Sequence, residues 1–321
     1  MPSGYGGGMT ASTAAPAVTT PFRFFDVRVS RIVDLSPSFR RFTFTGADLD
    51  QFADNGFDQR IKLLLPLPCG YDAVPTGDSW YLQWRELPDE LRHPIRTYTA
   101  RTARNDVREL DVDMVLHGDG GPASAWAGCA QVGDSLVILG PNREHAGPSG
   151  GIDFVPPAHA DRLLLAGDET AAPAIAGILE RLPRDARGEA LIEVPVTGDA
   201  IPVDAPAGVT VRWLPRDGAH HGSLLVPAVQ AACKRLMPHD APLPEGMELD
   251  DVDIDDGILW EVPVDHATGE PLRQSAALYA WLAGEAGAIK TLRRHLVGTC
   301  GVDRKAVAFM GYWREGRAEG A

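Results

Sequence analysis

Residues 162–182 read RLLLAGDETAAPAIAGILERL, and this stretch decides the fold. Its first part, RLLLAG, is a nearly continuous apolar run, which is typical of a strand buried on both faces of a parallel sheet. The second part then places Ile175, Ile178, Leu179 and Leu182 on one face of a helix. A buried strand, a short turn and an amphipathic helix in this order predict an α/β domain.

Towards the C-terminus, strand and helix signals continue to alternate. Further apolar runs are separated by helical stretches, and they lie at residues 189–194, 209–214, 277–283 and 306–311. This alternation predicts a parallel sheet over residues 161–321.

One Pro-rich and then acidic segment, 238–260, interrupts that alternation. Its aspartates at 251, 253 and 255 resemble the start of a calcium loop. Asp256 stands where such a loop needs glycine, however, and Val262 where it needs glutamate. We therefore interpret the segment as a solvated insert.

The sequence before residue 147 has a different pattern, with apolar residues at period two. Seven candidate strands lie at 22–33, 41–45, 60–65, 79–84, 97–101, 110–116 and 135–139. Short strands separated by Gly and Pro predict an antiparallel barrel or sandwich. We expect this β domain to span 21–147, with a Gly- and Pro-rich linker at 148–160.

Composition excludes several classes of protein. The chain has 321 residues, with 30 Lys+Arg against 44 Asp+Glu and a net charge of −14. Such a balance argues against nucleic-acid binding and against a polybasic membrane surface. No apolar run reaches about 18 residues, so we expect no membrane insertion. Residues 1–20 are rich in Gly, Ala, Ser and Thr and lack the features of a secretory signal, so we expect a disordered tail.

The four cysteines, Cys69, Cys129, Cys233 and Cys300, are widely spread and contain no CxxC pair. This spacing favours neither a disulfide framework nor a metal or iron–sulfur site. It is most compatible with a reducing cytoplasm.

Three loops near the expected domain junction carry candidate chemistry. In the first, Arg96 and Tyr98 are two apart on a strand and project to one face. There a guanidinium could hold a phosphate, and a phenol ring could stack on a flat heterocycle beside Thr99. A surface cation–aromatic pair explains the same residues equally well.

The other two loops could each bind an anionic group at a helix start. Residues 117–127 place Pro122 at a first helical turn after a glycine-rich stretch, and Gly118, Gly120 and Ala123 match a dinucleotide pattern weakly. Residues 166–174 join the first parallel strand to a helix, whose N-terminus favours an anion. An ordinary strand–helix turn with acidic capping residues is the alternative there.

Taken together and in order, these segments resemble the siderophore-interacting protein family, flavin-dependent ferric-siderophore reductases of the ferredoxin-reductase-like superfamily. The resemblance runs from about Phe22 to Glu319, and its most specific pieces are RTYTAR (96–101), VLHG…GPASAWA (115–127), LLAGDETAAPAI (164–175), AWLAGEAGAIKTLRRHL (280–296) and GYWREGRAE (311–319). It implies an N-terminal Greek-key antiparallel β-barrel that binds FAD, followed by a parallel-sheet α/β domain that binds NADPH or NADH.

The resemblance also implies roles for single residues. Arg96 would contact the FAD pyrophosphate, Tyr98 would pack on the isoalloxazine, and Thr99 would lie near its reactive nitrogen. The remaining cofactor contacts would come from His117, Gly121, Pro122, Ala123 and Ser124 on the flavin side, and from Gly167, Asp168, Glu169, Thr170, Ala171, Gly284 and Glu285 on the nucleotide side. The family pattern usually has Leu where Ala172 stands, which is a change in packing. Arg216, at the end of another strand, could meet an adenosine 2′-phosphate, although a solvated strand-end arginine is equally compatible with the sequence.

The implied reaction is reduction of a ferric siderophore, with no obligatory acid, base or nucleophile, by a protein that we expect to be a cytoplasmic monomer. A flavin links hydride transfer from the nicotinamide to one-electron reduction of Fe³⁺. Ferric siderophores are often anionic, so basic residues are the candidate substrate contacts: Arg60, Lys62, Lys290, Arg293 and Arg294. A flavin reductase with another acceptor and a non-catalytic siderophore-binding protein are the alternatives.

Overall fold

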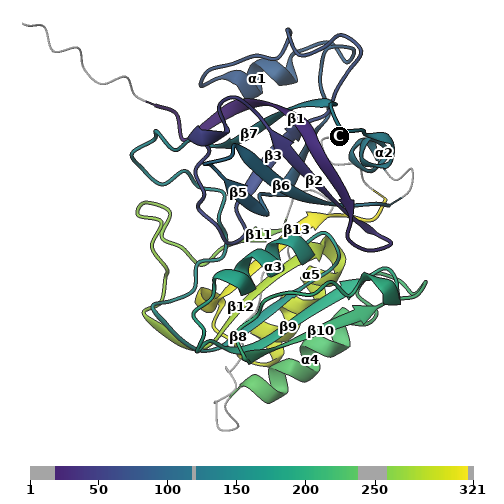
Figure 1. Ribbon diagram of the computed structural model, residues 1–321. Helices are drawn as coiled ribbons and strands as arrows, with labels where there is room; N and C mark the ends of the chain where they lie inside the picture. Colours follow the sequence, from purple (N-terminus) through teal and green to yellow (C-terminus); the bar gives the residue numbers. More distant parts are fainter. Residues whose placement is uncertain (1–18, 118–120, 238–258, 317–321) are drawn as a thin grey trace, which may run out of the picture.

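The computed structural model describes residues 19–117, 121–237 and 259–316, which form a β-rich part and an α/β part (Figure 1). Most of the expected tail (1–20) and most of the expected insert (238–260) lie outside these residues, as do Gly118 and Gly120. Within the described ranges, no helix has both the length and the apolar character needed to cross a membrane.

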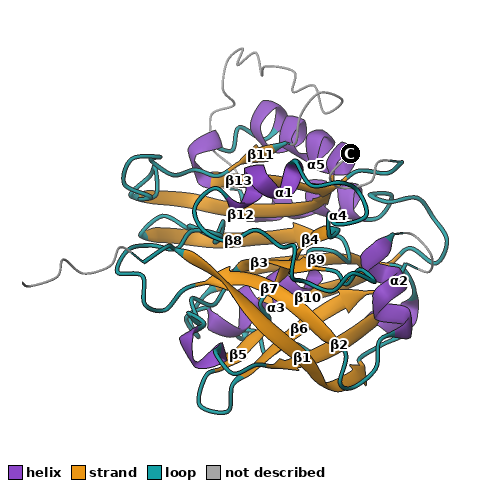
Figure 2. Cartoon of the chain, turned by 90° about the horizontal axis from the view of Figure 1, so that it is seen from above, coloured by secondary structure: helices purple, strands orange, loops and turns teal. Residues whose placement is uncertain are grey.

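The N-terminal part is one curled antiparallel sheet, which confirms the predicted β domain. Its strands are β1 (Phe22–Asp34), β2 (Phe39–Thr45), β3 (Arg60–Leu64), β4 (Ile95–Thr99), β5 (Thr102–Arg104), β6 (Glu109–Val115) and β7 (Ser135–Pro141). They lie in the order β4-β3-β7-β1-β2-β6-β5, so β4 and β5 are the two edges of the curled sheet. Seen from above, β1 and β2 run diagonally to the strands of the second sheet (Figure 2).

Period-two alternation produces the core of this sheet. Phe25, Val27 and Val29 of β1 are buried against Phe42 and Phe44 of β2. The 3-10 turn η1 (Leu49–Gln51) and the helix α2 (Pro122–Cys129) are not part of the strand ladder, and their buried residues pack in the core of the curled sheet. The Trp126 ring of α2 lies 5.0 Å from the Phe42 ring, so this tryptophan packs in the core.

The predicted strand at residues 79–84 is wrong, because this segment forms the helix α1 (Trp80–Arg85). Trp80 and Trp84 are four residues apart, a spacing that fits a strand and a helix equally well. Leu82 distinguishes the two, since a strand would bury it with the tryptophans and here it is 62% exposed. Trp80 packs edge-on against Phe24, and the Trp84 indole donates to the His93 carbonyl.

The C-terminal part is an α/β sheet with the order β10-β9-β8-β12-β13-β11. Its strands are β8 (His159–Gly167), β9 (Arg187–Val194), β10 (Gly208–Pro215), β11 (Trp260–Glu261), β12 (Ser275–Glu285) and β13 (Val307–Trp313). The ladders from β10 to β13 are parallel, as predicted, and β11 joins the edge in the antiparallel direction. The end of the expected insert, at Trp260, is thus a strand residue.

Helices cover both faces of this sheet (Figure 1). The helices and turns are α3 (Ala172–Arg181), η2 (Thr197–Asp199), α4 (Leu225–Leu236), α5 (Ala286–Arg293), a π-helix η3 (Arg294–Thr299) and η4 (Arg304–Ala306). α4 and α5 share one buried cluster, whereas α3 lies on the face turned toward the curled sheet. Phe39, Val115 and Phe154 from the N-terminal part and the connection join the α3 cluster, so the two parts share a core.

Buried polar groups hold the two parts together. Asp58, between η1 and β3, accepts bonds from the backbone N–H groups of Asp153 and Phe154 and from the Trp281 indole of β12 at 3.1–3.3 Å. Burial, followed by the neighbouring charge of Asp153, raises the pKa of Asp58 to about 6. Asp199 of η2 similarly accepts from the Ser38 N–H at 2.8 Å. The geometry at the domain junction is therefore set by specific contacts.

Candidate cofactor and nucleotide site

The edge strand β4 carries the first candidate loop. Arg96 pairs with Leu63 of β3 and Tyr98 pairs with Ile61, so both side chains leave the strand on the same face, as expected from their spacing. Tyr98 packs against the core of the curled sheet and is partly exposed, while Thr99 is buried. An aromatic ring and a guanidinium are thus presented side by side at a sheet edge.

Beside this strand, α2 begins with a glycine and a proline. Gly121 is the N-cap residue with φ of 153°, and Pro122 occupies the first turn. Glycine has no side chain with which to cap the helix, so its first N–H groups suit an anion. Ser124 is turned inward, where its hydroxyl accepts the His117 N–H at 2.8 Å. Ala123 is buried with it. These features fit the pyrophosphate of a dinucleotide.

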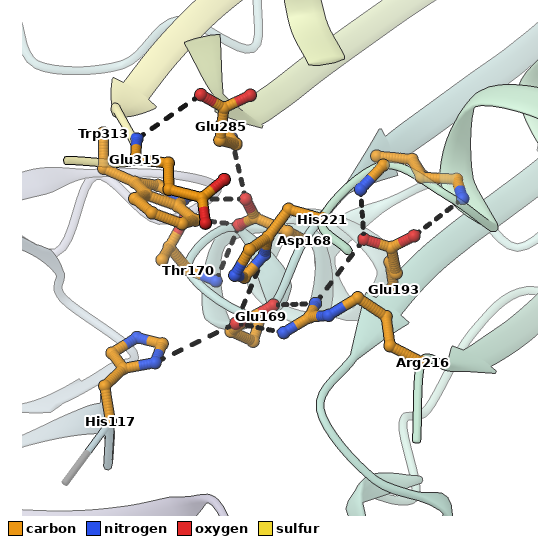
Figure 3. A network of polar contacts seen from close by, with 12 residues as sticks. His117, Asp168, Glu169, Thr170, Glu193, Arg216, His221, Glu285, Trp313 and Glu315 are labelled. Atoms are coloured by element: carbon orange, nitrogen blue, oxygen red, sulfur yellow. Dashed lines mark hydrogen bonds and ion pairs between the residues drawn. The ribbon is translucent and has the colours of Figure 1, made fainter. Parts of the chain in front are cut away.

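The carboxyl ends of β8 and β12 meet at Asp168 (Figure 3). One carboxylate oxygen of Asp168 accepts from the Glu285 N–H at 2.7 Å and from the Trp313 indole at 2.8 Å. The other oxygen accepts from the N–H and the hydroxyl of Thr170 at 2.9 and 2.5 Å. Burial, and next the charge of Glu169, raises the pKa of Asp168 to about 6. Asp168 is therefore a positioning residue that ties together both turns and the C-terminal strand.

Glycine is required where these turns approach each other. A Cβ on Gly284, whose φ is 147°, would lie 2.6 Å from the Asp168 carboxylate. A Cβ on Gly167 would lie 2.5 Å from both the Ala171 methyl and the Ala283 carbonyl oxygen. Contacts this short exclude any larger residue without backbone movement.

Glu169 is fully buried, and its main partner is Arg216. The Arg216 guanidinium donates to both Glu169 oxygens, at 2.6 and 2.8 Å, and approaches Glu193 at 3.5 Å. The Arg216 side chain is only 7% exposed. The structure thus turns Arg216 toward internal carboxylates, whereas a contact with a 2′-phosphate would need an open guanidinium. Sequence could not show this, because Glu169 is 47 residues away.

Two histidines lie on either side of the same carboxylate (Figure 3). His117, which follows β6, and His221, which precedes α4, each place Nδ1 3.9 Å from Glu169. Burial lowers the pKa of His117. The carboxylate thus lies at the junction between the curled sheet and the α/β part.

Two residues of this site were missed by the sequence reasoning. The His221 ring meets the Trp313 ring edge-on, with centroids 4.6 Å apart. Trp313 lies in the segment GYWREGRAE (311–319) that carries the family resemblance, but no role was expected of it. No sequence signal pointed to His221. Donor atoms of Asp168, Glu169 and His221 lie within 4.8 Å of one another, but Arg216 already neutralises Glu169, and we assign no metal.

The two basic residues expected on the N-terminal part come together. Arg60 and Lys62 of β3 line a cavity of about 250 Å³ with Phe22, Thr97 and Leu139. Arg60 pairs with Asp153 at 2.9 Å and lies over the Trp260 ring at 4.5 Å. Lys62 donates to the Thr97 hydroxyl at 3.3 Å. The cavity is thus lined by two cationic side chains, of which Arg60 is paired with Asp153.

The three basic residues near the C-terminus that were expected to contact the substrate differ in their exposure. Arg293 is 4% exposed and pairs with Glu261 of β11 at 3.0 Å, whereas Lys290 is half-buried and Arg294 is exposed. Arg293 is buried because its guanidinium turns inward to Glu261, and Arg294 is the first residue of the π-helix that follows α5. The antiparallel strand that supplies Glu261 was not predicted.

Comparison with known proteins gives consistent results over both parts. Residues 28–145 match the siderophore-interacting FAD-binding domain family, and residues 160–316 match the siderophore-interacting protein family. Ferric vibriobactin reductase ViuB of Vibrio cholerae is 29% identical over 89% of this chain and 88% of its own. The NADPH-dependent ferric-chelate reductase of Escherichia coli is 34% identical over 62% and 74%. The crystal structure of siderophore-interacting protein SipS from Aeromonas hydrophila covers 94% of both chains with 32% identity and a TM-score of 0.62.

Proposed function

The chain belongs to the siderophore-interacting protein family, and from that premise we propose that it reduces ferric siderophores with electrons that pass from NAD(P)H through FAD. One observation carries this proposal: the segments matching the FAD-binding and siderophore-interacting families meet where the buried carboxylate of Glu169 lies 3.9 Å from Nδ1 of the exposed His117. Relatives with ferric reductase names support the reaction type.

The flavin side of the site rests on β4 and the start of α2. We assign to Arg96 the binding of the FAD pyrophosphate, together with the N–H groups that follow Gly121. Tyr98 supplies a flat, half-buried surface for the isoalloxazine, and Thr99 and His117 border it. Bound FAD would supply the conversion between two-electron and one-electron transfer.

The nucleotide side rests on the turns after β8 and β12. Asp168 fixes both turns, and the segments Gly167–Ala171 and Gly284–Glu285 would face the nicotinamide nucleotide. We give Arg216 the role of holding Glu169 in place, not of contacting the nucleotide. NADPH is the proposed donor, because the ferric-chelate reductase relative is named as NADPH-dependent.

Mutation of the basic cavity tests the substrate contacts. We expect Lys62→Glu to raise the KM for an anionic ferric siderophore about tenfold, because reversing one charge at the contact costs roughly 1.4 kcal/mol. NADPH oxidation with a neutral acceptor should be unchanged. Lys305→Glu, the same charge change at an exposed position on η4, is the control. An increase with Lys290→Glu and none with Lys62→Glu would instead place the substrate beside α5.

The proposed reaction is tested by anaerobic spectroscopy of the holoprotein. NADPH should bleach the flavin bands, and a ferric siderophore should restore them while a ferrous chelator gains colour. Restoration by free flavin or quinone but not by the ferric siderophore would favour a general flavin reductase. A protein that binds the siderophore but never holds flavin, even after incubation with FAD, would be a binding protein.

We further propose that the protein acts as a cytoplasmic monomer. All four cysteines are free thiols, which supports a reducing compartment. Light scattering after size-exclusion chromatography measures the molar mass and tests the monomer directly.

A further inference from the structure

Two cysteines and a histidine come together on the face of the α/β sheet that is remote from the curled sheet. Cys233 lies on α4 and is fully buried, in the cluster against which the Cys300 side chain packs. Cys300 is partly exposed, and its Sγ lies 3.2 Å from Nε2 of His295. A partly exposed thiol therefore has a basic nitrogen on one side and a second thiol behind it.

The π-helix η3 creates this arrangement. A π-helix is defined by backbone hydrogen bonds between residues five apart. Here the Cys300 N–H donates to the His295 carbonyl at 2.9 Å. This spacing brings the side chains of His295 and Cys300 to the same side of the chain. An ordinary α-helix would rotate them apart, because five residues correspond to about 500°. π-helical turns are frequent at functional sites.

We propose that Cys300 and Cys233 form a reversible disulfide when the protein meets a peroxide, with His295 as the base that deprotonates Cys300. Nε2 of His295 lies 3.2 Å from the Cys300 sulfur, within reach of the thiol proton. Burial, and next the nearby charge of Lys234, lowers the pKa of His295, so the ring is neutral before the transfer, although it is a weaker base than a solvated histidine. The reactive form of cysteine is the thiolate, so the proton of the thiol must be transferred before or during the attack.

The reaction balances with hydrogen peroxide as the oxidant. The Cys300 thiolate attacks one peroxide oxygen, so an S–O bond forms, the O–O bond breaks and the departing hydroxide takes the proton held by His295. The Cys233 sulfur then attacks the Cys300 sulfur, forming the S–S bond and breaking the S–O bond. The hydroxide that leaves the Cys300 sulfur in this second step takes the Cys233 proton. Two thiols are oxidised to one disulfide, and one peroxide is reduced to two waters.

The other two cysteines provide internal controls. Cys69 and Cys129 are both exposed, and within the described part of the chain their thiols donate to backbone carbonyls, at 3.5–3.6 Å for Cys69 and 3.5 Å for Cys129. Both thiols are more exposed than Cys300, but they lack the histidine contact that Cys300 has. We therefore expect them to react more slowly than Cys300. If exposure alone governs oxidation, Cys69 and Cys129 should react first.

The test treats the full-length flavin-loaded protein with hydrogen peroxide, blocks remaining thiols after denaturation, and measures intact and peptide masses. We expect Cys233 and Cys300 to lose reactivity together, a peptide cross-link between them, a mass lower by two hydrogen atoms, and full recovery with dithiothreitol. Oxygen added to Cys300 while Cys233 stays alkylatable, a cross-linked dimer, or two unreacted thiols would each overturn the proposal.

Two variants separate the roles of the partners. In Cys233→Ala, oxidation should stop at a Cys300 sulfenic acid that dimedone traps. In His295→Gln, the rate of disulfide formation should fall about tenfold while Cys69 and Cys129 react as before. An unchanged rate in His295→Gln would remove the histidine from the mechanism. The wild-type peptide map decides on the disulfide even if a variant does not fold.

Discussion

Replacing Arg96 with alanine is expected to give a folded protein that lacks FAD. A guanidinium on a phosphate makes charge-assisted hydrogen bonds of about 1.5–3 kcal/mol each. Loss of two such bonds weakens binding roughly a hundred- to ten-thousand-fold. Arg96 lies on the edge strand β4 beside the partly exposed Tyr98, so no buried core depends on its side chain.

The flavin content of purified Arg96→Ala, read from the ratio of visible to ultraviolet absorbance, measures this effect. Ferric siderophore reduction should fall in parallel and recover in part at high added FAD. Arg85→Ala, at an exposed arginine of α1, is the matched control and should keep its flavin. Stoichiometric flavin in Arg96→Ala would refute the assignment of the pyrophosphate site.

Replacing Arg216 with leucine is expected to lower the free energy of unfolding by about 3–5 kcal/mol, the usual cost of removing one partner of a buried ion pair. Glu169 and Glu193 are both fully buried and would lose their guanidinium. Glu193 would keep its three backbone donors, the N–H groups of Gly222, Leu224 and Leu225, whereas Glu169 would lose its two shortest bonds. Denaturant unfolding followed by circular dichroism measures the change.

Arg184→Leu is the control for this effect. Arg184 also pairs with a carboxylate through two hydrogen bonds, to Asp204 at 3.0 and 2.6 Å, but both partners are exposed, so its loss should leave stability nearly unchanged. The same variants test the nucleotide. If Arg216→Leu kept its stability and lost affinity for NADPH more than for NADH, Arg216 would bind the 2′-phosphate after all.

The sequence was sufficient where a signal is local. The strand, turn and helix at 162–182 correspond to β8 and α3, and the alternation in the first half correctly predicted the antiparallel sheet apart from α1. The position of the turns also followed, because the carboxyl ends of parallel strands meet at one edge. Trp80 and Trp84 led to the wrong prediction of a strand at 79–84, because a spacing of four residues fits both the period of a strand and that of a helix.

Partners far apart in the sequence could not be predicted. Glu169 pairs with Arg216, 47 residues away, and Glu261, directly after the segment interpreted as an insert, pairs with Arg293 from a short strand. The π-helix after α5 leaves no pattern in composition, yet it decides which side chains share a face. Pairing of buried charges and local changes in helix type are properties of the folded chain.

The bonds of Asp58 bear on how this protein can evolve. Its carboxylate, from the first half, satisfies the Trp281 indole of the second half and two N–H groups of the connection between them. The two halves are therefore not interchangeable modules. Recombination that joined this curled sheet to the nucleotide domain of a distant relative would keep the Asp58 carboxylate but lose the Trp281 indole that it accepts from. Change at the junction should proceed by paired substitutions, while the basic cavity on β3 can diversify one residue at a time.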